Sequence, residues 1–181
     1  RNERRDDWLK LAYREIPEAA NAVLLTQAEF QLDQGQHEQA LATLRRLDEN
    51  SKDHGHALAL MARLYFQLQD WTALSDILPR VKKHSQVKAD TLTEWTVRVH
   101  REKLETAEDG DAVVSAFKQV PKACKSDISV LQAYYSGLMR TGRNLQAEKE
   151  LTAALKSNWS GPLVRLFGLL EGNDASKQLK R

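Results

Sequence analysis

The stretch VLLTQAEFQLDQGQHEQALATL at residues 23–44 is followed, 34 positions later, by ALALMARLYFQLQDWTALSDIL at residues 57–78. Apolar and small residues occupy the same places in both copies. The equivalent pairs are Leu24 and Leu58, Ala28 and Ala62, Ala40 and Leu74, and Leu44 and Leu78, while Gln31, Leu32 and Leu47 are matched by Tyr65, Phe66 and Val81. Apolar residues recur at helical spacing on both sides of a central turn, so each copy predicts a helical hairpin.

A 34-residue period is typical of the tetratricopeptide repeat, whose hairpin buries its apolar face only by stacking on neighbouring hairpins. Small residues at Ala28, Ala62 and Ala40 mark the points where two helices of a hairpin approach closely. The composition also favours helix, because Leu, Ala, Gln and charged residues dominate over Gly and Pro. The sequence therefore predicts an all-α fold, a tetratricopeptide-type superhelix or α-solenoid of about ten helices.

We expect the 181 residues to form one array of repeats. Turns are predicted at Gly35 and Gly142 and at Gln69–Asp70, where Asp70 is a candidate N-cap, and Pro17 is expected to end the first helix. The predicted segments are the second helix of a cut repeat at 1–16, repeats at 18–49 and 55–84, a degenerate repeat at 87–120, a repeat at 127–157 and an incomplete repeat at 161–181.

Apolar residues at both ends of this array lack a predicted neighbour to cover them. They are Trp8, Ala12 and Ile16 at the start, and Leu163, Leu166, Leu169 and Leu170 at the end. We therefore expect self-association of the chain through its terminal helices.

The balance of charge argues against a nucleic-acid module, which usually carries a basic excess. The chain has 27 basic and 25 acidic residues and a net charge of +2. Its single cysteine, Cys124, excludes an internal disulfide framework and is expected to fill apolar space near a helix end. No apolar run is long enough to span a bilayer, so the segment is expected to be soluble.

Residues with catalytic or ligating chemistry are present without the spacing that a site requires. His54 and His56 are the only close histidine pair, and neither a third ligand nor a helical i, i+4 arrangement accompanies them. No nucleophile elbow or dinucleotide-binding glycine motif occurs. We expect no enzymatic activity, no metal and no cofactor. Trp71, Trp95 and Trp159 lie near repeat boundaries, where core packing is expected.

The concave groove lined by the first helix of each hairpin is the predicted binding surface for other proteins. Superposing the three regular hairpins places nine side chains on it: Leu25, Glu29 and Leu32, then Arg63, Phe66 and Gln67, then Gln132, Ser136 and Arg140. Mixed charge around Phe66 suits a peptide or a helix laid along this groove.

The segment at residues 59–87 carries a resemblance to a known family. It contains Leu64-Tyr65, the turn Gln69-Asp70-Trp71, the string Leu74-Ser75-Asp76-Ile77-Leu78-Pro79 and then Lys82-Lys83-His84, and a helix start Leu163-Val164-Arg165-Leu166 follows later. Proline inside the second helix of a repeat is unusual, because it costs about 3 kcal/mol. In this order the segments resemble the repeat region of HemY, a proteobacterial inner-membrane family encoded among late haem-biosynthesis genes.

The resemblance implies transmembrane helices before this region, repeats on the cytoplasmic side of the inner membrane, and a scaffold for late haem synthesis. Nothing in the sequence resembles a flavin-dependent oxidase, since no glycine-rich dinucleotide motif is present. The expected function is thus a non-enzymatic interaction scaffold whose partners are late haem-biosynthesis enzymes. Two alternatives remain open, an adaptor of another envelope or secretion system and a haem- or porphyrin-binding carrier.

Overall fold

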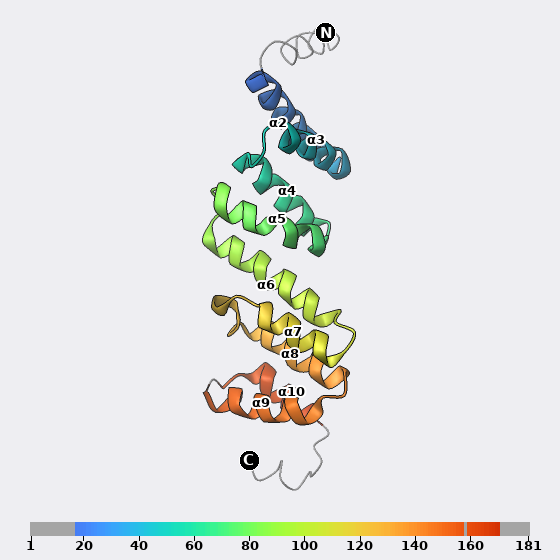
Figure 1. Cartoon of the computed structure of the whole chain (residues 1–181), viewed down its shortest axis with the longest axis vertical. Coiled ribbons are helices and arrows are strands. Elements are labelled where there is room, and N and C mark those ends of the chain that lie inside the picture. The colour runs from blue at the N-terminus through green and yellow to red at the C-terminus, as the bar shows by residue number, and fades with distance from the viewer. Residues whose placement is uncertain (1–16, 158, 171–181) are drawn as a thin grey trace. The chain divides into compact units, whose positions relative to one another are not determined.

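The computed structural model describes residues 17–157 and 159–170, and every regular element within them is helical. This confirms the all-α prediction. Among these residues there are nine α-helices and one short 3-10 helix, and Figure 1 labels the α-helices. In chain order they are α2 (Pro17–Asp33), α3 (His37–Asn50), α4 (Gly55–Gln67), α5 (Trp71–His84), α6 (Ala89–Glu105), α7 (Gly110–Gln119), η1 (Lys122–Cys124), α8 (Ile128–Arg140), α9 (Asn144–Ser157) and α10 (Gly161–Leu169).

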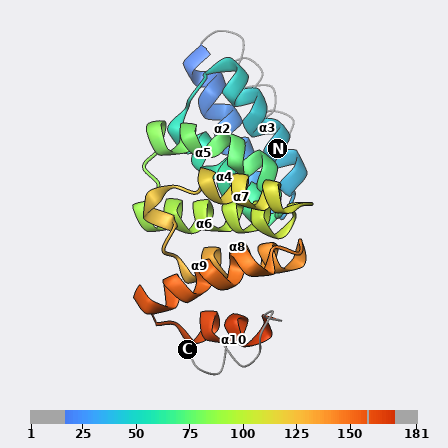
Figure 2. The ribbon, with the colours of Figure 1, turned by 60° about the horizontal axis from the view of Figure 1, so that its bottom comes forward.

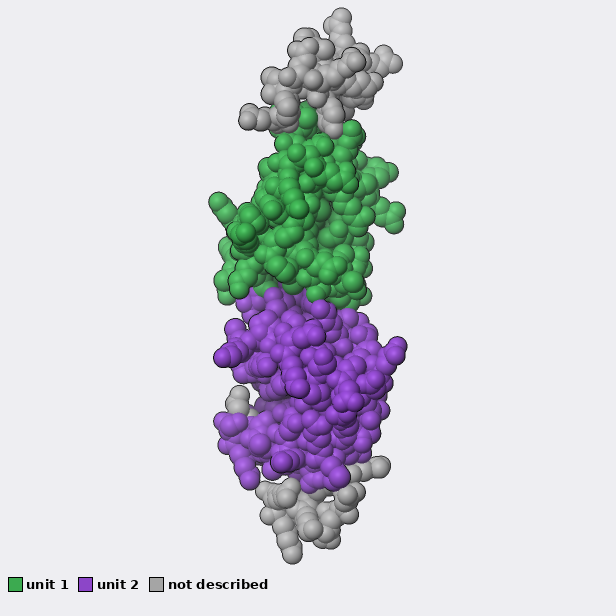
Figure 3. Space-filling model, viewed as in Figure 1, with its two compact units in different colours: residues 1–92 green, residues 93–181 purple. Residues whose placement is uncertain are grey.

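The chain divides into two compact units, residues 1–92 and residues 93–181, which Figure 3 shows in separate colours. The first unit contains the hairpins α2–α3 and α4–α5, and the second contains helices α7 to α10. The predicted first helix at residues 1–16, with Trp8, Ala12 and Ile16, lies outside the described residues.

The first unit buries equivalent positions of its two hairpins. Helix α2 packs on α3, α3 on α4, and α4 on α5. Four pairs that are 34 residues apart are almost fully buried, namely Leu24 and Leu58, Ala28 and Ala62, Ala40 and Leu74, and Leu47 and Val81. The match is incomplete at two other pairs, because Leu78 is half-buried where Leu44 is buried, and Gln31 is half-buried where Tyr65 is buried. Gln31 instead accepts a hydrogen bond of 2.8 Å from the Thr43 hydroxyl of α3.

The turns of three hairpins share one backbone geometry. Gly35, Gln69 and Gly142 have φ values of 71°, 57° and 77°, and each lies two positions after the last residue of its helix. In each turn this residue donates to the carbonyl three positions back, and the next residue donates to the carbonyl five positions back. This pair of bonds is the Schellman motif, which satisfies the last carbonyls of a helix and favours glycine at the left-handed position.

Gln69 holds the position that glycine holds in the other two turns, so its left-handed backbone is strained. We expect Gln69→Gly to raise the free energy of unfolding by about 0.5–1 kcal/mol. Gly35→Ala is the matched reverse change and should lower it by about 1 kcal/mol, because alanine is strained at the positive φ of residue 35. A Cβ there would meet no atom within 4 Å, so no steric clash adds to this cost. Urea unfolding measures both, and a Gln69→Gly protein less stable than wild type would contradict the turn geometry.

Aspartates begin three of the helices. The Asp70 carboxylate accepts a hydrogen bond of 3.0 Å from the Ala73 amide, which confirms the predicted N-cap of α5. Asp109 and Asp127 cap α7 and α8 in the same way. Helix α5 continues through Pro79 to His84, so the unusual proline is accommodated within the helix.

The second unit builds its core between α7, α8, α9 and α10. Figures 1 and 2 show α8, α9 and α10 as neighbours, and α10 packs on both of the others. Leu104, Val113, Leu138, Leu151 and Leu163 are almost fully buried in this core. A Cβ at Gly137 would lie 3.1 Å from the Val113 side chain, so glycine lets α8 approach α7 closely.

In the second half of the chain, the short helix η1 was not predicted from the sequence, while its Cys124 is buried as apolar filler, as expected. The expectation for the terminal leucines needs correction. Leu163 and Leu170 are buried against the unit rather than left open, because α10 packs on α8 and α9. Of the predicted terminal leucines, Leu166 is half-buried and only Leu169 stays exposed.

The alanines at the helix contacts provide a second test. Ala62 has no exposed surface, so we expect Ala62→Leu to destabilise the fold by about 1–3 kcal/mol through overpacking. Ala28→Leu should act equally, whereas Ala42→Leu on the exposed side of α3 should leave stability nearly unchanged. Thermal and urea unfolding report the differences. Equal stability of Ala62→Leu and Ala42→Leu would show that Ala62 does not lie at a close contact between two helices.

Candidate interaction surface

Six of the nine predicted groove residues lie on α2 and α4 of the first unit, and we call this set the α2–α4 surface. It consists of Leu25, Glu29 and Leu32 on α2 and of Arg63, Phe66 and Gln67 on α4. Glu29, Arg63 and Gln67 are exposed, and the three apolar members are half-buried. This distribution follows from helical periodicity. Leu25, Leu32 and Phe66 lie three or four positions from the buried Ala28 or Ala62 and so border the packed face, whereas Glu29, Arg63 and Gln67 lie off it.

A side-chain contact joins the two helices of this surface. The Glu29 carboxylate lies 2.9 Å from Nε2 of His56, at the start of α4. Both side chains are about half exposed, so the pair is a surface contact of small energetic weight. His56 was not among the predicted groove residues, and its position seven residues before Arg63 on one helix face was the signal available in the sequence.

Phe66 has a partner within its own hairpin. Its ring meets the Trp71 ring edge to face, with centroids 5.6 Å apart and planes at 82°. Edge-to-face geometry is a preferred arrangement of aromatic pairs. Phe66 therefore helps to fix the α4–α5 turn, and the polar side chains beside it are the more accessible members of the surface.

The other three predicted residues lie on α8 of the second unit. Ser136 is exposed and Gln132 is half-buried. The Arg140 guanidinium donates hydrogen bonds to the backbone oxygens of Leu104, at 3.4 Å, and Ala107, at 2.7 Å. Both oxygens belong to the end of α6 and the turn after it, so Arg140 satisfies carbonyls that the helix itself leaves unpaired.

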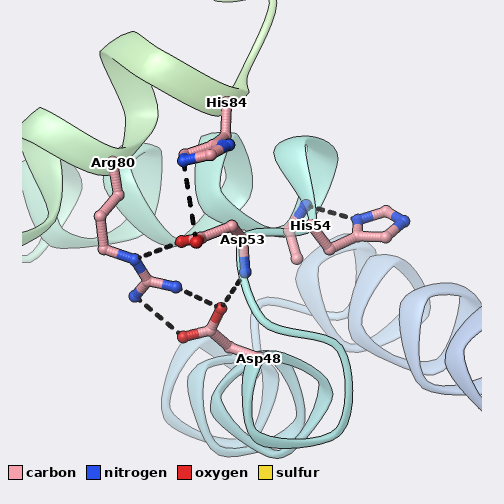
Figure 4. Close-up of polar contacts among 6 residues, drawn as sticks. Asp48, Asp53, His54, Arg80 and His84 are labelled. Carbon is pink, nitrogen blue, oxygen red and sulfur yellow. Dashed lines mark hydrogen bonds and ion pairs between the residues drawn. The ribbon is translucent and has the colours of Figure 1, made fainter.

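Figure 4 shows a cluster of charged side chains that the sequence analysis did not predict. Arg80 on α5 donates two hydrogen bonds to the Asp48 carboxylate, at 2.6 and 2.9 Å, and a third to Asp53 at 2.7 Å. His84 lies 3.7 Å from the other oxygen of Asp53. The Asp53 amide in turn donates to Asp48. No sequence motif marks these residues, since Asp48 and Arg80 are 32 positions apart.

This Arg80 cluster ties the end of α3 and the α3–α4 turn to α5. Asp53 has a positive φ of 64°, a conformation that aspartate tolerates better than most residues. The hydrogen bond from Arg80 lowers the pKa of Asp53, with smaller contributions from nearby positive charge. The hydrogen bond to Asp48 raises the pKa of Arg80. Because each charge faces its partners, the cluster fits a structural clamp rather than a reactive centre.

Other side chains that could take part in catalysis or ligand binding have structural roles or are buried. Nδ1 of His54 accepts a hydrogen bond from the Ala57 amide and so caps α4. Burial lowers the pKa of His100, and the charge of Lys103 adds to this effect. Burial also raises the pKa of Cys124. Among the described residues, no three His, Cys, Asp or Glu side chains are grouped to hold a metal ion.

Two expectations about the surface have different outcomes. Trp95 is buried and Trp71 is half-buried, as expected for core packing. Trp159 is 77% exposed, so the packing predicted for it is wrong; it lies in the connection between α9 and α10, outside either helix. In the part of the chain that is described, no helix is long and apolar enough to cross a membrane.

The Arg80 cluster predicts how stability depends on pH. The pKa of Asp53 is lower in the folded chain than in the unfolded chain, so its contribution is present above about pH 4 and is lost as the pH falls through the folded value. We expect Arg80→Met to be less stable than wild type at pH 7 and to lose less stability between about pH 5 and 3. Urea midpoints across this range measure the effect.

Arg63→Met is the matched control, because Arg63 is exposed and has no ion pair in the described structure. It should keep the acid dependence of the wild type. Parallel curves of urea midpoint against pH for wild type and Arg80→Met would show that Arg80 does not lower the pKa of Asp53 in the folded chain.

No protein-family model, curated protein or solved structure matches the chain. The resemblance to the HemY family therefore stays a prediction. Function has to be argued from the repeated hairpins and from the surfaces that they expose.

Proposed function

We propose that the chain is a non-enzymatic interaction scaffold built from tetratricopeptide-type hairpins, which stack as an α-solenoid. The observation that carries this proposal is the burial of the same positions 34 residues apart in α2–α3 and α4–α5. The shared turn geometry at Gly35 and Gln69 supports it, since these residues are themselves 34 positions apart. Repeat hairpins of this kind bind partners on the concave surface that their first helices line.

The α2–α4 surface is the proposed site of partner contact. Its exposed members, Glu29, Arg63 and Gln67, offer both signs of charge and an amide on neighbouring helices. Neither Arg63 nor Gln67 has a side-chain hydrogen bond within the described structure, so both are free to pair with a partner. A peptide or helix with its own mixed charges fits such a surface, because complementary charges set orientation and association rate.

The partners that we propose are late haem-biosynthesis enzymes, and the support for this is the resemblance of residues 59–87 to the HemY family. On this proposal the region works at the cytoplasmic face of the bacterial inner membrane, attached through a membrane anchor. The same fold would serve an adaptor of another envelope or secretion system, and that alternative differs only in which proteins are captured.

A double substitution tests the surface. Arg63→Glu with Gln67→Glu changes exposed side chains of α4 only, so folding should be kept while partner capture from native membranes falls about tenfold or more. Affinity capture with the full-length protein, followed by mass spectrometry, measures the loss and names the partners.

Lys118→Glu with Gln119→Glu is a matched control, because it makes the same change of charge at exposed positions of α7. This control should capture partners as the wild type does. Undiminished capture by the α4 variant would exclude the α2–α4 surface. A shifted Soret band on titration with haem would instead support the carrier, and captured proteins of another envelope system would replace the haem assignment.

A further inference from the structure

Exposed apolar side chains gather in the last part of the described chain. Leu145, Trp159 and Leu169 are 65%, 77% and 68% exposed, the three highest values among the exposed large apolar residues. Two of them flank α9, with Leu145 in its first turn and Trp159 two residues after its end. Apolar groups exposed to this degree, and bordered by polar residues, are typical of protein contact sites.

Between these two apolar residues, α9 presents a basic stripe. Leu145, Lys149, Thr152 and Lys156 follow at intervals of four, three and four, so they share one face of the helix. Ala147 and Leu151 on the opposite face are fully buried. An open depression runs along the outer face and is lined by Leu145, Glu148, Lys149, Thr152, Ala153 and Lys156.

The positive charge of this stripe is not neutralised within the described structure. Lys149 and Lys156 are exposed and form no ion pair there. Glu150, their acidic neighbour on α9, is turned inward and accepts hydrogen bonds from the Tyr134 hydroxyl at 2.9 Å and from the Gln146 amide at 2.8 Å. Glu148 at the edge of the depression is half-buried. The stripe therefore presents two ammonium groups about 10 Å apart along the helix axis.

We propose that the outer face of α9, from Leu145 to Trp159, binds an acidic segment of a partner protein. This segment carries two carboxylates about two helical turns apart, which pair with Lys149 and Lys156, and an apolar side chain at each end, which packs on Leu145 or Trp159. The inference rests on the proposed function as an interaction scaffold and adds a second surface, in the other unit, with a defined partner chemistry.

A protein segment fits this face better than a lipid bilayer. A single myristoyl chain gives only marginal membrane binding, and one Leu with one Trp buries less apolar area than such a chain. A partner protein obtains more from the same two side chains, because exposed aromatic residues that become fully packed dominate the energetics of interfaces.

The probe is a fluorescein-labelled helical peptide based on Ala and Gln, with Leu, Glu, Glu and Leu placed on one face at the spacing of the α9 stripe. A second peptide has Lys in place of both Glu. We expect fluorescence anisotropy of the whole chain with these probes to show at least about tenfold tighter binding of the Glu peptide, weakening as salt rises. Lys149→Glu with Lys156→Glu should reverse this preference, and Trp159→Ala should weaken both peptides.

Lys118→Glu with Lys122→Glu controls for net charge at exposed positions outside α9 and should keep the wild-type preference. Equal binding of the two peptides, no binding of the Glu peptide, or a preference that survives Lys149→Glu with Lys156→Glu would overturn the proposal. Binding to phosphatidylserine vesicles but not to the Glu peptide would also overturn it and would identify a membrane surface as the ligand. Partner capture through α4 is measured separately, so either surface can fail alone.

Discussion

The close approach of paired helices at fully buried alanines is the constraint on which the rest of this structure depends. Ala28, Ala40, Ala62 and Ala147 have no exposed surface, and each lies where a larger side chain would push two helices apart. Large aliphatic residues such as Leu44, Leu58 and Leu138 then fill the space around these contacts. Because a helical hairpin has too little core of its own, its stability comes from packing of this kind.

Polar groups fix the turns and connections between helices, which apolar contacts alone do not hold in place. The left-handed residues at the hairpin turns set where each second helix begins. Three arginines hydrogen-bond to segments that have little apolar surface to bury. Arg80 holds the α3–α4 turn, Arg140 caps the end of α6, and Arg143 bonds to Asp111 of α7 at 2.6 Å. Gly110 makes room for this last contact, since a Cβ there would collide with the Arg143 side chain.

Helix positions and most of the buried residues were predictable from the sequence, because apolar periodicity and turn residues are local signals. The predicted hairpin at 127–157 corresponds to α8 and α9, and Asp70 caps α5 as expected. The Arg80 cluster was not predictable, since Asp48 and Arg80 meet only after the hairpins have packed. Arg140 shows the same limit. Its bonds to the backbone of the α6–α7 connection come from tertiary structure.

Contact surfaces are proposed on the two units separately, a surface of mixed charge on α2 and α4 and a basic one on α9. The central claim is that proteins bind the exposed face of α2 and α4, the first helices of their hairpins. Photo-crosslinking in living cells tests this most directly, with a benzoylphenylalanine in place of Arg63 on α4 or in place of Lys82 on α5 of the full-length protein. The account predicts a specific crosslinked protein from position 63 and none from position 82. Crosslinks from position 82 alone, or from neither position, would contradict it.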